Sequence, residues 1–184
     1  MRYHLNASDV SKQKPTGRAL IQVAEDGENC IVLAQGANSD RTDLPRVDFS
    51  RFDYCLLQNE IPIEDTLRTL QEAHAAGVKT VFNPSPMPGA DILSAFPWKS
   101  LDWLLVNEGE AQDLVEILMG SKNDGDDSLA ALKSDDRFSN TNIVMTRGAQ
   151  GVRALIRDEH ISCPSGHVDH VFDTTAAGDT FTVR

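Results

Sequence analysis

The residues near the carboxyl end have types and spacing that suit phosphate chemistry. An apolar run, His170-Val171-Phe172, leads into small residues and then into an acid, as Asp173-Thr174-Thr175-Ala176-Ala177-Gly178-Asp179-Thr180-Phe181. If a helix starts here, the backbone N–H groups of Ala176, Ala177 and Gly178 converge and can bind an anion. Asp179 beside that anion could accept a proton from an attacking hydroxyl. The alternative interpretation is a tight turn into a helix without a ligand.

The composition describes one ordinary domain. The 184 residues are 40% hydrophobic and 24% charged, and the net charge is −11. This charge argues against nucleic-acid binding, which needs a basic surface. We expect no membrane segment and no secretory signal, because no apolar run approaches the roughly 18 residues that a membrane helix needs. Cys30, Cys55 and Cys163 give no disulfide or zinc-ligand spacing, so we expect a cytoplasmic setting.

Strands and helices alternate along the chain. Apolar runs predict a hairpin at 18–33 with an Asp26-Gly27 turn, and strands at 54–58, 79–82, 101–106, 142–145, 152–156, 161–163 and 168–172. Helical spacing predicts helices at 62–76, 91–95, 107–120 and 129–132. This alternation indicates an α/β fold with a mostly parallel sheet and helices on both faces.

Polar residues follow the predicted strands, where ligands bind in such sheets. They are Glu60, Asn83, Asn107 with Glu110, and Thr146 with Gly148. Asn107 and Glu110 also have the spacing of a helix capping box, and one residue can both cap a helix and bind a ligand.

Two other nucleotide-binding motifs are absent. Gly120 to Gly125 has the glycine spacing of a P-loop, but Asp126 stands where lysine is required, and no G-x-G-x-x-G closes a first strand. His167 and His170 would lie on opposite faces of a strand, which argues against a metal site.

Several stretches together resemble the ribokinase family, the PfkB sugar kinases. Asp173 to Phe181 is similar to the family signature D-T-x-[GA]-A-G-D-[TS]-F. Four further stretches resemble family motifs: Gln58-Asn59-Glu60-Ile61-Pro62, Asn83-Pro84-Ser85-Pro86, Asn107-Glu108-Gly109-Glu110 and Thr146-Arg147-Gly148-Ala149-Gln150-Gly151. The 17–33 hairpin resembles part of the lid that covers the sugar in this family. The resemblance implies a three-layer ribokinase-like fold, divided into a polar lead-in (1–15), a partial β lid (16–38) and a partial sugar kinase domain (39–184).

The resemblance also implies an activity and residue roles. The activity is ATP-dependent phosphorylation of the primary hydroxyl of a sugar, with D-ribose giving ribose 5-phosphate. Asp179 would be the base and contact the sugar, Glu60 would bind the sugar, and Ala176, Ala177 and Gly178 would form the anion hole. The other implied roles are nucleotide binding by Asn107, Thr146 and Gly148, magnesium binding through water by Glu110, and binding of activating potassium by Asp173 and Thr175.

The chain lacks segments that the resemblance leads us to expect on both sides. The first strands, a sugar-binding acid and the first family signature are absent before it, and the segments that close the adenine pocket are absent after it. We therefore expect a truncated member that is inactive alone and exposes an apolar sheet edge. We expect ATP and a small sugar as partners, and a homodimer formed through the lid. Two alternatives stay open: an inactive remnant that binds nucleotide or another chain, and a different sugar or nucleoside kinase of the family.

Overall fold

A six-stranded sheet organises the molecule. The computed structural model describes residues 14–24, 29–39, 47–121, 125–171 and 174–183. The sheet order is β3-β4-β5-β6-β7-β8, with β3 to β6 parallel and β7 and β8 antiparallel, which confirms a mostly parallel sheet. The strands are β3 (Tyr54–Leu57), β4 (Lys79–Phe82), β5 (Trp103–Asn107), β6 (Asn142–Thr146), β7 (Val152–Ile156) and β8 (Glu159–Cys163).

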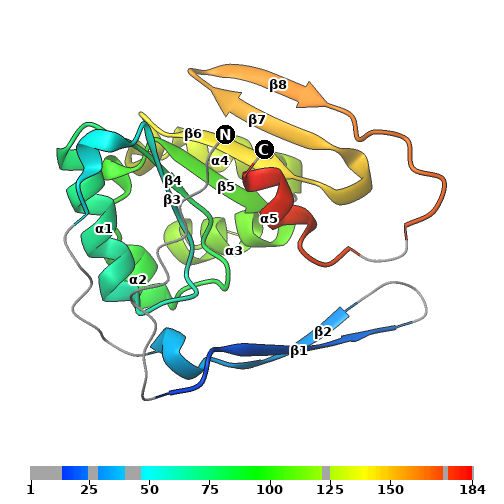
Figure 1. The fold of residues 1–184 in the computed structure, drawn as a ribbon. Coiled ribbons are helices and arrows are strands. Elements are labelled where there is room, and N and C mark those ends of the chain that lie inside the picture. The colour runs from blue at the N-terminus through cyan, green and yellow to red at the C-terminus, as the bar shows by residue number, and fades with distance from the viewer. Residues whose placement is uncertain (1–13, 25–28, 40–46, 122–124, 172–173, 184) are drawn as a thin grey trace.

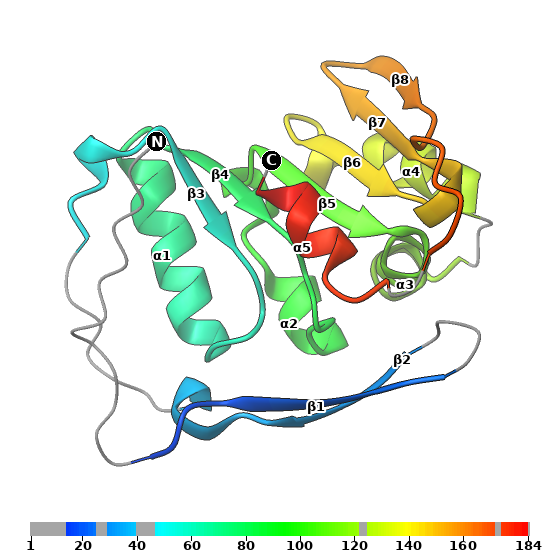
Figure 2. The same ribbon diagram turned by 45° about the vertical axis from the view of Figure 1, so that its right-hand side comes forward.

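Helices lie on both faces of this sheet (Figures 1 and 2). Four of them pack on one face: α1 (Ile63–Ala75), α2 (Ala90–Ala95), α3 (Glu108–Met119) and α4 (Gly125–Ser134). The short α5 (Ala177–Thr182) lies over the other face. None of the helices in the described part of the chain has the length and apolar character that a membrane crossing requires.

The main core lies between the sheet and α1 to α4. Successive strand residues point to opposite faces, so Leu104 and Val106 of β5 join this core whereas Leu105 joins a smaller cluster on the other face. Fully buried residues from four helices meet these strands: Leu70, Leu93, Leu114 and Leu132. Burial on this scale fixes the strands, and with them the ends from which the polar residues project.

Four aromatic rings pack against one another in a row within the main core. The ring centroids of Phe82 and Phe96 are 4.8 Å apart, those of Phe96 and Trp98 are 4.4 Å apart, and those of Trp98 and Phe138 are 4.8 Å apart. The Trp98 indole N–H donates to the Leu93 carbonyl at 2.9 Å, so its polar atom is satisfied inside the core.

A two-stranded hairpin forms the second sheet, seen as the long blue ribbon in Figure 1. It consists of β1 (Arg18–Val23) and β2 (Asn29–Ala34), as predicted from the apolar pattern. Ile21 lies opposite Ile31 and Leu20 lies opposite Val32, so the two pairs are on opposite faces of the hairpin. The predicted Asp26-Gly27 turn lies outside the described residues.

Two sequence predictions need correction. Residues 168–171 form no strand, although a strand was predicted at 168–172. The apolar residues there suit a strand, but a strand also needs a hydrogen-bonding neighbour, and residues 168–171 pair with none of the described strands. The helix predicted at 129–132 is longer, because α4 begins at Gly125 and ends at Ser134.

Candidate active site

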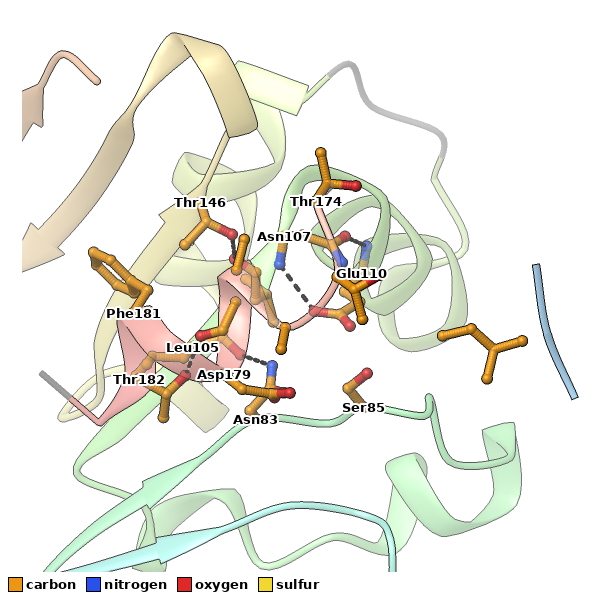
Figure 3. A pocket seen from close by; sticks show the side chains of 16 residues that line it. Asn83, Ser85, Leu105, Asn107, Glu110, Thr146, Thr174, Asp179, Phe181 and Thr182 are labelled. Carbon is orange, nitrogen blue, oxygen red and sulfur yellow. Dashed lines mark hydrogen bonds between the residues drawn. The ribbon is translucent and has the colours of Figure 1, made fainter. Parts of the chain in front are cut away.

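A pocket of about 190 Å³ lies at the carboxyl ends of β4, β5 and β6. Figure 3 shows side chains converging on it from the loop after β4, the start of α3, the end of β6 and the segment that forms α5. The structure brings together these residues from the sequence-predicted set: Asn83, Asn107, Glu110, Thr146, Thr175, Ala176, Ala177, Gly178 and Asp179. Parallel strands explain this convergence, because their carboxyl ends meet at one edge of the sheet.

Asp179 lies on the pocket wall in the first turn of α5. Its side chain is exposed, and the Gln58 side-chain amide donates to its Oδ1 at 3.3 Å. The carboxylate is therefore accessible from the pocket and is not directed into the packed interior. Such a group can accept a proton from a hydroxyl bound in the same pocket.

The start of α5 presents backbone donors to the pocket. Ala176 has φ 59° and ψ 16°, a left-handed conformation, and the helix follows it directly. The Ala177 N–H donates to the Thr174 carbonyl at 3.2 Å, whereas the Thr180 N–H makes the first helical bond to the Ala176 carbonyl at 2.9 Å. An anion bound here thus competes with Thr174 for the amide of Ala177.

Asn107 and Glu110 form a capping box at the start of α3. The Glu110 N–H donates to Asn107 Oδ1 at 2.8 Å, and the Asn107 N–H donates to Glu110 Oε2 at 2.9 Å. Both residues also line the pocket. The cap fixes both side chains and leaves the second carboxylate oxygen of Glu110 for a water or a cation.

The oxygen donors suit a magnesium ion held mainly by water. Mg²⁺ usually keeps several waters and takes one or two carboxylates together with substrate phosphates. Among the described residues, no group of three or more His, Cys, Asp or Glu side chains is placed to hold a metal. Glu110 would supply one such carboxylate, with waters and phosphates as the other ligands.

Hydrogen bonds tie the loops after β3 and β4 together. The Asn83 side-chain amide donates to the Leu105 carbonyl at 2.9 Å. Asn59 donates twice to the β4 loop, from its backbone N–H to the Ser85 carbonyl at 3.1 Å and from Nδ2 to the Pro86 carbonyl at 2.7 Å. The first bond joins the loop after β4 to β5 and the other two join it to the loop after β3, so together they fix the pocket-lining residues Asn83 and Ser85.

The turn after β6 supplies another wall. Thr146 lines the pocket, and its hydroxyl is 3.5 Å from the Val106 carbonyl. Arg147, which sequence reasoning did not single out, forms an ion pair with Glu108 at 2.9 Å and so joins this turn to the start of α3. The sequence offers no usable signal for this pair. Acidic residues often begin helices and basic residues often follow strands, so their presence does not predict a contact.

Three predicted site residues lie elsewhere or cannot be placed. Glu60 is exposed in the bend after β3 and is not part of the pocket wall. Gly148 is also not part of the wall; with φ 50° it begins the short turn 148–150 that follows Thr146 in the chain. Asp173 lies outside the described residues. Ile31 of the hairpin, which was not predicted, does reach the wall. The alternation of the hairpin strands offered a signal for it, because one apolar face had to meet another surface.

Comparison with known proteins identifies the family of this chain. The pattern of the family described as pfkB family carbohydrate kinase matches residues 4–183. The chain belongs to this family. A ribokinase of Haemophilus influenzae is 36% identical over 97% of the chain and 56% of its own length.

Solved structures of this kinase family share the fold. A ribokinase from Cryptococcus neoformans in complex with ADP has a TM-score of 0.83 and 40% identity, over 93% of this chain and 58% of that one. An Arabidopsis thaliana ribokinase with ribose and ATP has a TM-score of 0.70 and 26% identity, over 92% of this chain and 55% of that one. The chain thus spans little more than half the length of the relatives it matches.

Proposed function

We propose that this chain provides the phosphoryl-transfer site of an ATP-dependent kinase that phosphorylates the primary hydroxyl of D-ribose. The observation that carries the proposal is the shared pocket of Asp179, the start of α5 and Glu110. A proton acceptor, amide donors and a carboxylate suited to hydrated magnesium are the groups that phosphoryl transfer needs close together.

Asp179 is the proposed base. As the sugar oxygen approaches the γ-phosphorus of ATP, the carboxylate accepts the proton of the hydroxyl. The new P–O bond forms while the bond to the β–γ bridging oxygen breaks, and ADP leaves. The amides at the start of α5 stabilise the negative charge on the transferring group, and the orientation of the two reactants supplies much of the acceleration.

The nucleotide and the two cations have proposed ligands of their own. We assign Asn107 and Thr146 to binding of the nucleotide phosphates. Gly148, in the turn after β6, is the third proposed nucleotide-binding residue. Bound magnesium would neutralise phosphate charge, and Glu110 would hold it through water. Asp173 and Thr175 are the proposed potassium ligands.

Ribose is proposed as the acceptor because the Haemophilus influenzae and Cryptococcus neoformans relatives described above are ribokinases. Glu60, on the loop after β3, is the proposed further sugar contact. A panel of ribose, fructose and adenosine as acceptors in a coupled assay tests this choice, and preference for another acceptor would reject ribose.

Replacing Asp179 by Asn tests the proposed base. We expect the rate of ADP formation from MgATP and ribose to fall about 10²- to 10⁴-fold, the usual loss for a general base. Calorimetric binding of MgATP should stay unchanged, because the amide has the same shape. Asp113→Asn on the exposed side of α3 is the matched control.

The same measurements distinguish kinase activity from the second candidate function, nucleotide binding without turnover. Binding of MgATP without turnover in the unmodified chain would favour a nucleotide-binding module. Turnover that survives Asp179→Asn would reject the role of Asp179.

A further inference from the structure

We propose that Gln58 is a positioning residue that holds the Asp179 carboxylate in the orientation needed to accept a proton. This inference rests on the proposed function of Asp179. Its starting observation is the hydrogen bond from Gln58 Nε2 to Asp179 Oδ1 at 3.3 Å, between residues 121 positions apart in the sequence.

Asp179 needs such a support because its own helix is weak. The helix α5 has six residues, and its N-cap residue Ala176 makes no side-chain capping hydrogen bond. Helices of this length have little stability of their own. The contact with Gln58 joins α5 to the loop after β3, so it limits the rotation of the Asp179 side chain.

Gln58, in contrast, sits on a well-anchored loop. Its carbonyl accepts a hydrogen bond from the fully buried Thr66 hydroxyl at 3.3 Å. The next residue, Asn59, is tied to Ser85 and Pro86, in the loop that forms part of the pocket wall. The backbone from which the donor side chain projects is thus fixed by α1 and by the β4 loop, whereas α5 lacks a side-chain cap.

The chemistry of an amide suits this role. The amide N–H₂ occupies one carboxylate oxygen and leaves the other for the proton of the hydroxyl. A neutral amide donates without titrating near neutral pH, so it does not compete for that proton. Asp179 can then be neutralised and recharged in each cycle while Gln58 keeps its contact.

The test uses the full chain and compares Gln58→Leu with Gln71→Leu, an exposed glutamine on α1 that serves as the control. We expect Gln58→Leu to lower kcat roughly 10- to 100-fold, the scale of a misplaced catalytic group, with KM for MgATP unchanged. Gln58→Asn, which is one methylene shorter, should behave in the same way, and Gln71→Leu should have no effect.

A second readout does not depend on turnover. Three-bond couplings between Asp179 Cγ and its backbone nitrogen and carbonyl carbon report the side-chain rotamer. We expect values of a single rotamer in the unmodified chain and averaged values in Gln58→Leu. Unchanged couplings, or averaged couplings with unchanged kcat, would overturn the positioning role. Averaged couplings in a chain whose unmodified form has no turnover would support the contact and reject the proposed function.

Discussion

At the scale of single residues, the start of α5 carries backbone strain beside the proposed base. Ala176 has φ 59°, a region in which a residue with a Cβ is less stable than glycine by about 1–2 kcal/mol. No side-chain hydrogen bond caps the helix at this position. The geometry of the proposed anion site is therefore held by a residue that does not favour it.

Ala176→Gly should stabilise the first turn of α5. The relief of strain exceeds the extra unfolded-state entropy of glycine, which is about 0.4–1 kcal/mol. Because α5 can open locally without global unfolding, the suitable measurement is hydrogen exchange of the Thr180 N–H, which donates to the Ala176 carbonyl. We expect its protection to rise about 2- to 5-fold, in line with a gain of somewhat under 1 kcal/mol.

Ala177→Gly is the matched control for this change. Ala177 is the first residue of the helix, where glycine has a lower helix propensity than alanine. Its replacement should therefore lower the protection of Thr180 or leave it unchanged. A fall in protection with Ala176→Gly would mean that strain at Ala176 does not limit the helix.

At the scale of elements, the sequence predicted the sheet because buried parallel strands are continuous apolar runs. The run Leu104-Leu105-Val106 ends at Asn107, so both the strand and the polar residue at its end could be read directly. The capping-box spacing of Asn107 and Glu110 predicted the start of α3, and both halves of the box are present. Local patterns were sufficient for the polar residues at the ends of β4, β5 and β6, which line the pocket.

Local patterns were insufficient where a contact joins distant segments. The bond between Gln58 and Asp179 depends on where α5 lies against the loop after β3, which no pattern within either segment specifies. The same reason explains why residues 168–171 form no strand, since their apolar residues have no neighbouring strand among those described. Glu60 follows a strand as predicted, but the direction of the bend after β3 places it outside the pocket wall.

An ion pair in the turn after α4 makes the stability of the domain depend on pH. Arg137 donates to both carboxylate oxygens of Asp135 at 2.8 Å and to the Leu118 carbonyl of α3 at 2.9 Å. The side-chain hydrogen bonds from Arg137 hold the pKa of Asp135 below its usual value of 3.8. A carboxyl group with a lowered pKa stabilises the fold above the usual value, and this contribution is lost as the pH falls through the folded-state pKa.

Asp135→Asn should therefore destabilise the chain at pH 7 and have little effect in acid. We expect a loss on the order of 1 kcal/mol at pH 7, because both partners are partly exposed. The asparagine oxygen can still accept the Arg137 backbone N–H, so the change removes mainly the charge. Thermal unfolding of both proteins between pH 7 and pH 3 measures the difference, and a difference that does not shrink toward acid pH would contradict the ion-pair assignment.

At the scale of the whole molecule, two of the exposed apolar surfaces in the described part of the chain could bind another copy. The first is the outer face of the hairpin, where Leu20 is 69% and Val32 is 62% exposed. Because Ile31 lines the pocket and alternation places Val32 on the other face, this pair points away from the site. The second is the β3 edge of the sheet, where Tyr54 is 57% and Leu56 is 46% exposed. Exposed apolar faces and unpaired strand edges both favour association between chains.

The outer hairpin face should contribute more to association than the strand edge, because its two large aliphatic side chains lie side by side and are the more exposed. We expect the chain to self-associate in sedimentation velocity at micromolar concentrations, and Leu20→Lys with Val32→Lys to shift it to the monomer. Val168→Lys with Val171→Lys, at residues of 63% and 64% exposure that belong to neither surface, is the matched control and should leave the distribution unchanged. If Leu56→Lys produces the monomer and the hairpin variant does not, the open edge of β3 is the association site, since charge on an edge strand opposes pairing with another chain.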